Sequence, residues 1–155
     1  MKRVFLIDSM SHIFRAYFAP MGARQDPLRN SKGQVTQAIF VFTNMLRKLL
    51  KDEQPEYIAA IFDTAAPTFR DELYADYKAN RQDTPEDILS AVPDIKRIIE
   101  GLNIPVIAID GYEADDVIGA LAKKAEKEGY EVYMVTPDKD YGQLVSEKIK
   151  IYKPP

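Results

Sequence analysis

Short apolar runs rich in β-branched residues alternate along this chain with longer stretches in which apolar side chains recur every three or four positions. The short runs predict β-strands over residues 3–7, 57–62, 104–109, 131–135 and 149–152. The helical spacing predicts helices over residues 35–50, 85–100 and 113–127. Strands that alternate with helices are typical of the α/β class, in which helices cover both faces of a parallel sheet.

Local signals predict where individual helices begin and end. We expect Thr84 to be an N-cap followed by Pro85 at the first helical position, where the missing N–H of proline costs nothing. Gly101 and Gly129 are expected to end the second and third predicted helices. The polar stretch over residues 19–34 is expected to be a long loop.

Composition narrows the possible chemistry. The 155 residues suit one domain, and a hydrophobic fraction of 46% is enough for a packed core. The chain has no Cys, which excludes a disulfide scaffold and thiolate metal sites, and its single His leaves little room for a histidine-rich metal site. No apolar run suits a signal peptide or a membrane span, so we expect a soluble, cytoplasmic protein. The net charge of −3 does not exclude nucleic acid, because basic residues can gather on one face.

Acidic residues follow four of the predicted strands. They are Asp8 and Asp63 after the first two strands, Glu113, Asp115 and Asp116 after the third, and Asp138 and Asp140 after the fourth. Because the carboxyl ends of parallel strands meet at one edge of a sheet, we expect these side chains to converge. Converging carboxylates repel one another, and Mg²⁺ or Mn²⁺ is the cation best suited to hold them. Such an edge could bind two ions about 3.5–4 Å apart, the spacing used for phosphodiester hydrolysis.

Each of these acids also has an ordinary structural explanation. Glu113, Asp115 and Asp116 fall in the first turn of a predicted helix, where acids cap free amides and complement the helix dipole. Asp138 could cap a short helix over residues 139–144. Asp8 or Asp63, taken alone, would be an ordinary loop residue. The coincidence at four strand ends favours a metal site, and both interpretations stay open at this point.

A second group of residues is basic and aromatic. One helical face of residues 68–81, with the sequence TFRDELYADYKANR, carries five of them: Arg70, Tyr74, Tyr77, Lys78 and Arg81. This face could bind phosphates beside Asp63 while its Tyr rings stack on bases, and Arg15 could add a phosphate contact. The alternative is a solvated helix with pairs between acidic and basic side chains.

Three motifs resemble those of the 5′-nuclease (5′-3′ exonuclease) domains of bacterial DNA polymerases I, members of the flap endonuclease superfamily. The motifs are FD(x)5FRDELYADYKANR, GYEADDVIGALA and TPDKDYGQLV, in the family's order and with family-like spacing. The similarity runs from Arg3 almost to the end of the chain. The combination of GYEADDVIGALA with DKD and YKANR is highly specific.

The resemblance implies a PIN-like, three-layer α/β/α core with a mainly parallel central sheet and a helical arch region between Arg81 and Glu100. It implies a divalent-metal-dependent nuclease that cuts DNA at 5′ flaps or nicks, removes RNA primers in replication and repair, and is attached to a polymerase domain. The seven acids listed by strand above match the family's metal ligands. Lys78 and Arg81 match catalytic positions that face the substrate together with Tyr77, and Arg15 and Arg70 match phosphate contacts.

The chain departs from the family pattern at a few places. Ser9 stands where the family often has Gly, and Thr136-Pro137 precedes DKD where a small residue with Gly or Ser is usual. The family continues into a helix–three-turn–helix and further Asp residues, so we expect residues 1–155 to be its N-terminal metal-binding part, with an incomplete second metal site.

Three other functions remain as alternatives. One is a nucleic-acid-binding module without turnover, and another is a PIN-type ribonuclease. The third is a phosphotransferase of the haloacid dehalogenase type with Asp8 as nucleophile. That chemistry needs a second Asp at position 10, where this chain has Met.

Overall fold

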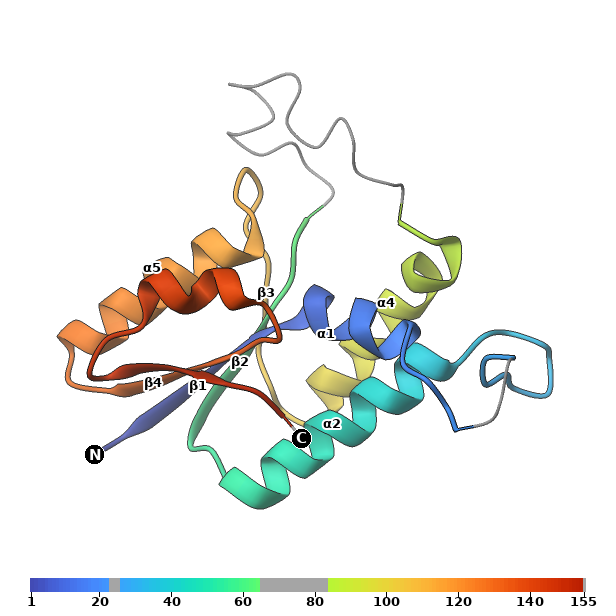
Figure 1. The fold of residues 1–155 in the computed structure, drawn as a ribbon, viewed down its shortest axis with the longest axis horizontal. Coiled ribbons are helices and arrows are strands. Elements are labelled where there is room, and N and C mark those ends of the chain that lie inside the picture. Colours follow the sequence, from blue (N-terminus) through green and yellow to red (C-terminus); the bar gives the residue numbers. More distant parts are fainter. Residues whose placement is uncertain (23–25, 65–83, 155) are drawn as a thin grey trace.

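A parallel β-sheet with helices on both faces organises the chain (Figure 1). The structure, a computed structural model, describes residues 1–22, 26–64 and 84–154. The elements in chain order are β1 (Arg3–Asp8), α1 (Ser9–Tyr17), α2 (Gln37–Glu53), β2 (Tyr57–Ile61), α4 (Glu86–Gly101), β3 (Val106–Ile107), α5 (Ala114–Lys127), β4 (Glu131–Val135), the 3-10 helix η1 (Lys139–Leu144) and β5 (Ile149–Tyr152).

The strand order within the described residues is β3-β2-β1-β4-β5, and every neighbouring pair is parallel. The chain first moves outward from β1 through β2 to β3, and then returns to the other side of β1 with β4. The order therefore reverses between β1 and β4. In open parallel sheets, ligands bind outside the carboxyl ends of the strands at such a reversal point.

Three layers result from the alternation of side chains along the strands. Phe5 and Ile7 of β1 pack on one face with α1, α2 and α4, while Leu6 packs on the other face with α5 and η1. Figure 1 shows these two groups of helices on opposite sides of the sheet. The three-layer α/β/α architecture with a parallel sheet is therefore confirmed.

Some predicted strands have the right bounds, while other elements differ from the prediction. The observed β4 and β5 have the predicted bounds, but β3 is only two residues long where six were predicted. At the start of the predicted strand, the backbone N–H of Ile104 donates to the Ile99 carbonyl at the end of α4, and after its end the Ile109 carbonyl accepts the N–H of Tyr112 in a turn. The helix α1 was not predicted at all.

Two of the predicted signals for α4 were wrong. Pro85, and not Thr84, is the N-cap, because its own carbonyl accepts the first helical bond from the N–H of Leu89. Gly101 is the last helical residue, and the left-handed turn that ends the helix comes at Asn103, with φ of 62°. Gly129 does end α5, with φ of 90°.

The expectation that residues 81–100 form an arch is wrong for the part that α4 occupies. Four α4 side chains are fully or almost fully buried in the core: Ile88, Ala91, Ile95 and Ile99. This helix packs against α1 and α2 and is part of the α/β/α core. The rest of the expected arch, residues 81–83, lies outside the described residues. In the described parts of the chain, every helix is too short or too polar to cross a membrane.

Candidate metal centre

A cleft of about 160 Å³ opens at the carboxyl ends of the strands. Five carboxylates line it: Asp8, Asp63, Glu113, Asp115 and Asp138. Ser11, Ala114 and Tyr141 complete its wall. The structure thus brings acids from four segments of the chain to one place.

The strand order explains why these acids meet. Asp8 ends β1, Asp63 lies two residues after β2, and Asp138 lies three residues after β4. Glu113 is the N-cap of α5, the helix that follows β3. Since β3, β2, β1 and β4 are consecutive neighbours in the sheet, their carboxyl ends form one continuous edge.

A second hollow, of about 370 Å³, adjoins the cleft between α5 and η1. Asp116 and Asp140 line this hollow and are absent from the wall of the cleft. Asp115 and Asp138 line both spaces. The seven predicted acids are therefore divided between two adjoining spaces that share two of them.

The first turn of α5 concentrates three of the acids. Carboxylate oxygens of Glu113, Asp115 and Asp116 lie within 4.8 Å of one another. Glu113 and Asp116 form a reciprocal capping box, in which the Glu113 N–H donates to Asp116 Oδ2 at 3.2 Å. Asp63 Oδ1 accepts a 2.7 Å bond from the N–H of Ala114. Glu113 and Asp116 therefore cap the helix, as the structural alternative predicted, and Asp63 adds a bond to the helix start that it did not predict.

Capping does not conflict with metal binding. An ionised carboxylate has two oxygens with about four lone-pair sites, and one backbone bond occupies only one of those sites. The helix N-terminus also favours negative charge and holds each side chain in a fixed place. The two interpretations of these acids are thus compatible at the level of single oxygen atoms.

Asp8 is the most buried acid of the cleft, with a side chain only 4% exposed. Burial raises its pKa, the hydroxyl groups of Ser11 and Thr136 oppose that rise, and the charges of Asp63 and Asp138 add to it. The Thr136 hydroxyl donates to Asp8 Oδ2 at 2.9 Å. A cation in the cleft would offset the repulsion, and the all-oxygen donor set suits a hard divalent ion.

Asp138 also caps a short helix, as the structural alternative predicted. It is the N-cap of η1, and its Oδ1 accepts a 2.9 Å bond from the N–H of Asp140. Its own N–H donates to the Thr136 hydroxyl at 3.1 Å. The turn after β4 is therefore held by side-chain bonds on both sides of Asp138.

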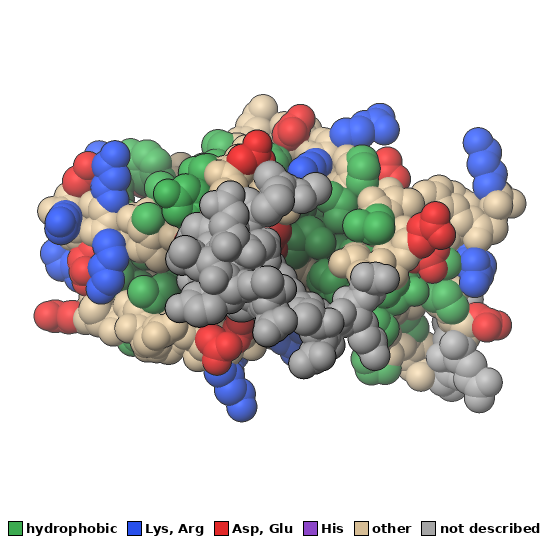
Figure 2. All heavy atoms as spheres, turned by 90° about the horizontal axis from the view of Figure 1, so that it is seen from above, with side chains coloured by type: hydrophobic (Ala, Val, Ile, Leu, Met, Phe, Trp, Pro, Cys, Tyr) green, Lys and Arg blue, Asp and Glu red, His purple; other side chains and the backbone are tan. Residues whose placement is uncertain are grey.

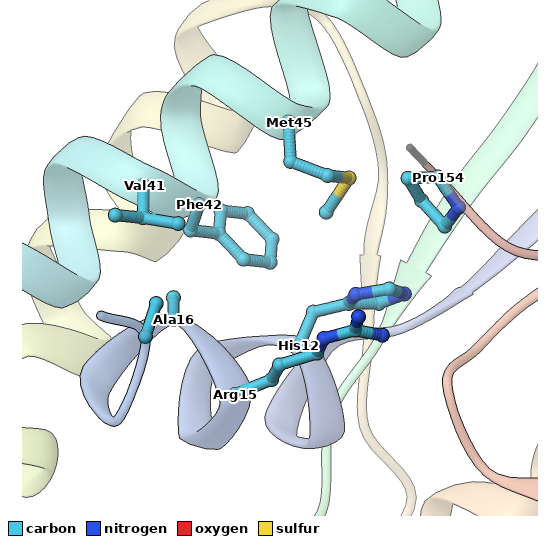
Figure 3. Close-up of a pocket in the computed structure, with 8 residues that line it drawn as sticks. His12, Arg15, Ala16, Val41, Phe42, Met45 and Pro154 are labelled. Carbon is cyan, nitrogen blue, oxygen red and sulfur yellow. The ribbon is translucent and has the colours of Figure 1, made fainter. Parts of the chain in front are cut away.

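Arg15 does not line the acidic cleft, although Ser11, four residues earlier on α1, does. Arg15 is exposed on α1 and lines a hollow of about 130 Å³ between α1 and α2 with His12, Met45 and Pro154 (Figure 3). His12 is 5% exposed, and its Nε2–H donates to the Val135 carbonyl at 3.1 Å. Burial lowers the pKa of His12 to about 4. The other predicted DNA-binding or catalytic residues, Arg70, Tyr77, Lys78 and Arg81, lie outside the described residues.

Sequence reasoning missed three hydroxyl groups, two in the wall of the cleft and one bonded to Asp8. Ser11 lies three residues after Asp8 on α1, Thr136 directly follows β4, and Tyr141 belongs to η1. Burial raises the pKa of Tyr141, and the nearby Asp8, Asp115 and Asp63 raise it further, so its hydroxyl stays protonated. None of the three had a usable signal in the sequence, because helix α1 was not predicted and the other two depend on contacts between distant segments.

Figure 2 views the molecule from above, on the side toward which β2 runs in Figure 1. Among the described residues seen there, Lys and Arg side chains lie mainly at the periphery of the face.

Comparisons with known proteins agree with this geometry. Residues 3–154 match the model of the family described as "5′-3′ exonuclease, N-terminal resolvase-like domain". The chain is 42% identical over 154 residues to a 5′-3′ exonuclease of Aquifex aeolicus, covering 99% of this chain and 52% of that protein. It is also 42% identical over 146 residues to DNA polymerase I of Chloroflexus aurantiacus, covering 94% of this chain and 15% of that one.

Solved structures show the same fold. The T5 D15 flap endonuclease, in complex with DNA and metal ions, superposes with a TM-score of 0.73 at 19% identity, over 98% of this chain and 55% of that one. This chain thus spans about half the length of the exonuclease that it matches, and a smaller share of the polymerase. Because the family model covers nearly every residue, the chain belongs to the family of 5′-3′ exonuclease N-terminal, resolvase-like domains.

Proposed function

We propose that this chain is the metal-binding part of a divalent-metal-dependent, structure-selective 5′ nuclease that hydrolyses DNA phosphodiesters. The observation that carries the proposal is the cleft lined by five carboxylates from four neighbouring strand ends. Family membership supports it, as do relatives named as a 5′-3′ exonuclease and as DNA polymerases I.

The cleft and the adjoining hollow suggest two sites for Mg²⁺ or Mn²⁺. Asp8, Asp63 and Glu113 would hold one ion in the cleft, and Asp116 and Asp140 would contribute to a second ion in the hollow. Asp115 and Asp138 line both spaces and could serve either ion. When bound, divalent ions activate water and neutralise charge on a phosphate. We propose that residues following position 155 complete the second site, since the relatives are longer than this chain.

The remaining roles belong to basic and aromatic side chains. Lys78 and Arg81 would stabilise the charge that develops on the scissile phosphate. The other proposed contacts to the DNA strand are made by Arg15, Arg70 and Tyr77. The proposed substrates are DNA with 5′ flaps or nicks and RNA primers on DNA, in a cytoplasmic protein whose polymerase domain is covalently attached.

A cleavage assay tests the proposal. The natural protein, including any residues that follow position 155, is incubated with a 5′-labelled flap DNA in Mn²⁺ or in EDTA. We expect metal-dependent cleavage that Asp8→Asn abolishes. Asp94→Asn is the matched control, because Asp94 lies on α4 and pairs with Arg97 at 3.7 Å, away from the cleft. Cleavage that survives in EDTA, or in Asp8→Asn, would contradict the proposal.

Binding without turnover is the second candidate, because the chain spans about half of its exonuclease relative. In that case the 155-residue chain would retain flap DNA without cutting it in the presence of Mn²⁺. A PIN-type ribonuclease is distinguished by the substrate, since it would cut single-stranded RNA in preference to a DNA flap.

A further inference from the structure

One buried hydroxyl joins the ends of the neighbouring strands β1 and β4 at the candidate metal centre. Thr136 directly follows β4, and its side chain is 0% exposed. Its Oγ1 lies 2.9 Å from Asp8 Oδ2 and 3.1 Å from the backbone nitrogen of Asp138. Both bonded residues place their side chains in the cleft.

The chemistry of the three groups fixes the direction of both hydrogen bonds. An ionised carboxylate can only accept, so the hydroxyl donates its one hydrogen to Asp8. A backbone N–H can only donate, so a lone pair of the same hydroxyl accepts from Asp138. An apolar side chain of the same shape could make neither bond, whereas Ser could make both.

The link matters because the two acids are held differently. Asp8 is buried at the end of a central strand, whereas Asp138 is exposed in the turn that leads to η1. A divalent ion needs its oxygen ligands at fixed distances, about 2.0–2.1 Å for Mg²⁺. A shared hydrogen-bond partner ties the exposed acid of this pair to the buried one.

We infer that Thr136 is a positioning residue of the metal centre. Its hydroxyl holds Asp8 and the Asp138 turn in the relative position that a divalent cation requires. The inference rests on the proposed function, because it assumes that these acids bind metal. Thr136 itself does not contact the ion. Loss of its hydroxyl should weaken metal affinity by about 10- to 100-fold, the usual effect of removing a partner of a metal ligand.

The test compares Thr136→Val with Thr136→Ser in the 155-residue chain. Mn²⁺ affinity is measured by titration calorimetry and by the electron paramagnetic resonance signal of free Mn²⁺. We expect the Val variant to bind Mn²⁺ about 10- to 100-fold more weakly and the Ser variant to bind close to the parent. Equal affinity in the folded Val variant and the parent would overturn the inference.

Thr43→Val is the matched control. The Thr43 hydroxyl is also buried, but it has no hydrogen-bond partner within the described residues and lies on α2. This substitution makes the same change in side-chain chemistry away from the cleft. Mn²⁺ affinity should not change. A loss as large as that of Thr136→Val would mean that any buried Thr→Val change disturbs the site, and would overturn the specific role.

Hydrogen exchange at the Asp138 amide gives a readout without metal. The amide should be protected in the parent and in Thr136→Ser, and should exchange faster in Thr136→Val. If the Val variant does not fold, Thr136→Ala replaces it with the same expectation. Rapid exchange of this amide in the folded parent would itself overturn the inference.

The Mn²⁺ titration distinguishes failure of this inference from failure of the proposed function. If the parent chain binds no Mn²⁺, the metal centre is wrong and both fail. If the parent binds Mn²⁺ but Thr136→Val binds it equally well, only the positioning role fails.

Discussion

Asp63 lines the cleft and also accepts a hydrogen bond from the first turn of α5. The same side chain therefore contributes to the fold and to the candidate site. Its Oδ1 accepts the N–H of Ala114. Asp116 and Asp138 show the same combination, as part of a capping box and as the cap of η1. A backbone bond fixes the side chain before any ion arrives, which lowers the ordering cost of metal binding. We therefore expect the caps to hold these side chains in place for the proposed metal site.

His12 should make stability depend on pH. Its pKa is lowered to about 4 in the folded state by burial, against about 6.5 in the unfolded chain. Above pH 6.5 both states are neutral and the effect is absent. As the pH falls from 6.5 to 4, the unfolded state gains a proton that the folded state does not, so the free energy of unfolding decreases, by up to about 3 kcal/mol.

Urea denaturation between pH 7.5 and 4 measures this effect by comparison with His12→Gln. The Gln side chain keeps an N–H donor for the Val135 carbonyl but does not titrate. Contributions from the carboxylates are common to both proteins and cancel in the difference. The parent should therefore lose more stability than the variant on acidification, and parallel pH profiles would refute the prediction.

Lys78→Ala should separate catalysis from binding, although Lys78 lies outside the described residues. A preorganised cation near the scissile phosphate is worth about 10²–10³ in rate, because it stabilises charge that develops only in the transition state. Single-turnover cleavage of a flap substrate should fall by that factor while flap affinity changes little. Equal losses in rate and affinity would reduce Lys78 to a general phosphate contact.

The acids of the candidate site could be predicted from the sequence, but the residues that form hydrogen bonds with them could not. Each acid follows a strand, and that position can be read directly from the chain. The role of Thr136 depends on β4 lying next to β1, a contact between residues 128 positions apart. The position of Tyr141 in the cleft wall likewise depends on how η1 packs against the sheet. Such contacts leave no local pattern.

At the scale of elements, two helices end in the same way on different residues. In α5 the N–H of Tyr130 bonds the Ala125 carbonyl, with Gly129 in the left-handed conformation between them. In α4 the N–H of Ile104 bonds the Ile99 carbonyl in the same pattern. There the left-handed residue is an Asn, which is the next most tolerated choice after Gly. Gly101 lies two positions before the left-handed residue Asn103, which explains why the end of α4 was predicted wrongly.

Gly129→Ala and Gly101→Ala should therefore have opposite effects. Gly129 has φ of 90°, so a Cβ there is strained, and the variant should lose about 1 kcal/mol or more of unfolding free energy. Gly101 is helical, and an added Cβ would meet no atom within 4 Å. Ala should stabilise the protein at that position by roughly 0.5–1 kcal/mol. Urea denaturation measures both, and destabilisation by Gly101→Ala would show that this helix end is misassigned.

Element type was more predictable than element length. Strands β4 and β5 are mostly apolar, with Glu131 and Lys150 as their charged residues, and polar residues follow them, so their bounds could be read from the chain. Helix α1 has only nine residues, SMSHIFRAY, too few to establish a helical period. It is held by packing on α2 and the sheet, because Ile13 and Ala16 are buried in the shared core.

At the scale of the whole molecule, the acid cluster opposes folding when no cation is present. Acids that are far apart in the unfolded chain come together at one edge of the sheet, where Asp63 and Asp138 act against the charge of Asp8. The alternation of strands and helices was enough to predict the architecture that brings them together. The repulsion between converging carboxylates was also predictable, but the burial of Asp8, which is the largest cause of its raised pKa, was not.

The substitution Asp63→Asn tests whether repulsion between these acids lowers the stability of the fold. The Asn side chain can still accept the N–H of Ala114 through its carbonyl oxygen, but it removes one negative charge beside Asp8. In EDTA the variant should melt a few degrees above the parent, since about 1 kcal/mol corresponds to 2–4 °C for a chain of this size. In Mn²⁺ the order should reverse, because ligand binding stabilises the parent by mass action and the variant binds more weakly. Asp94→Asn should leave both the melting temperature in EDTA and the Mn²⁺ shift near those of the parent. If Mn²⁺ raises the melting temperature of Asp63→Asn as much as that of the parent, Asp63 caps α5 without binding metal.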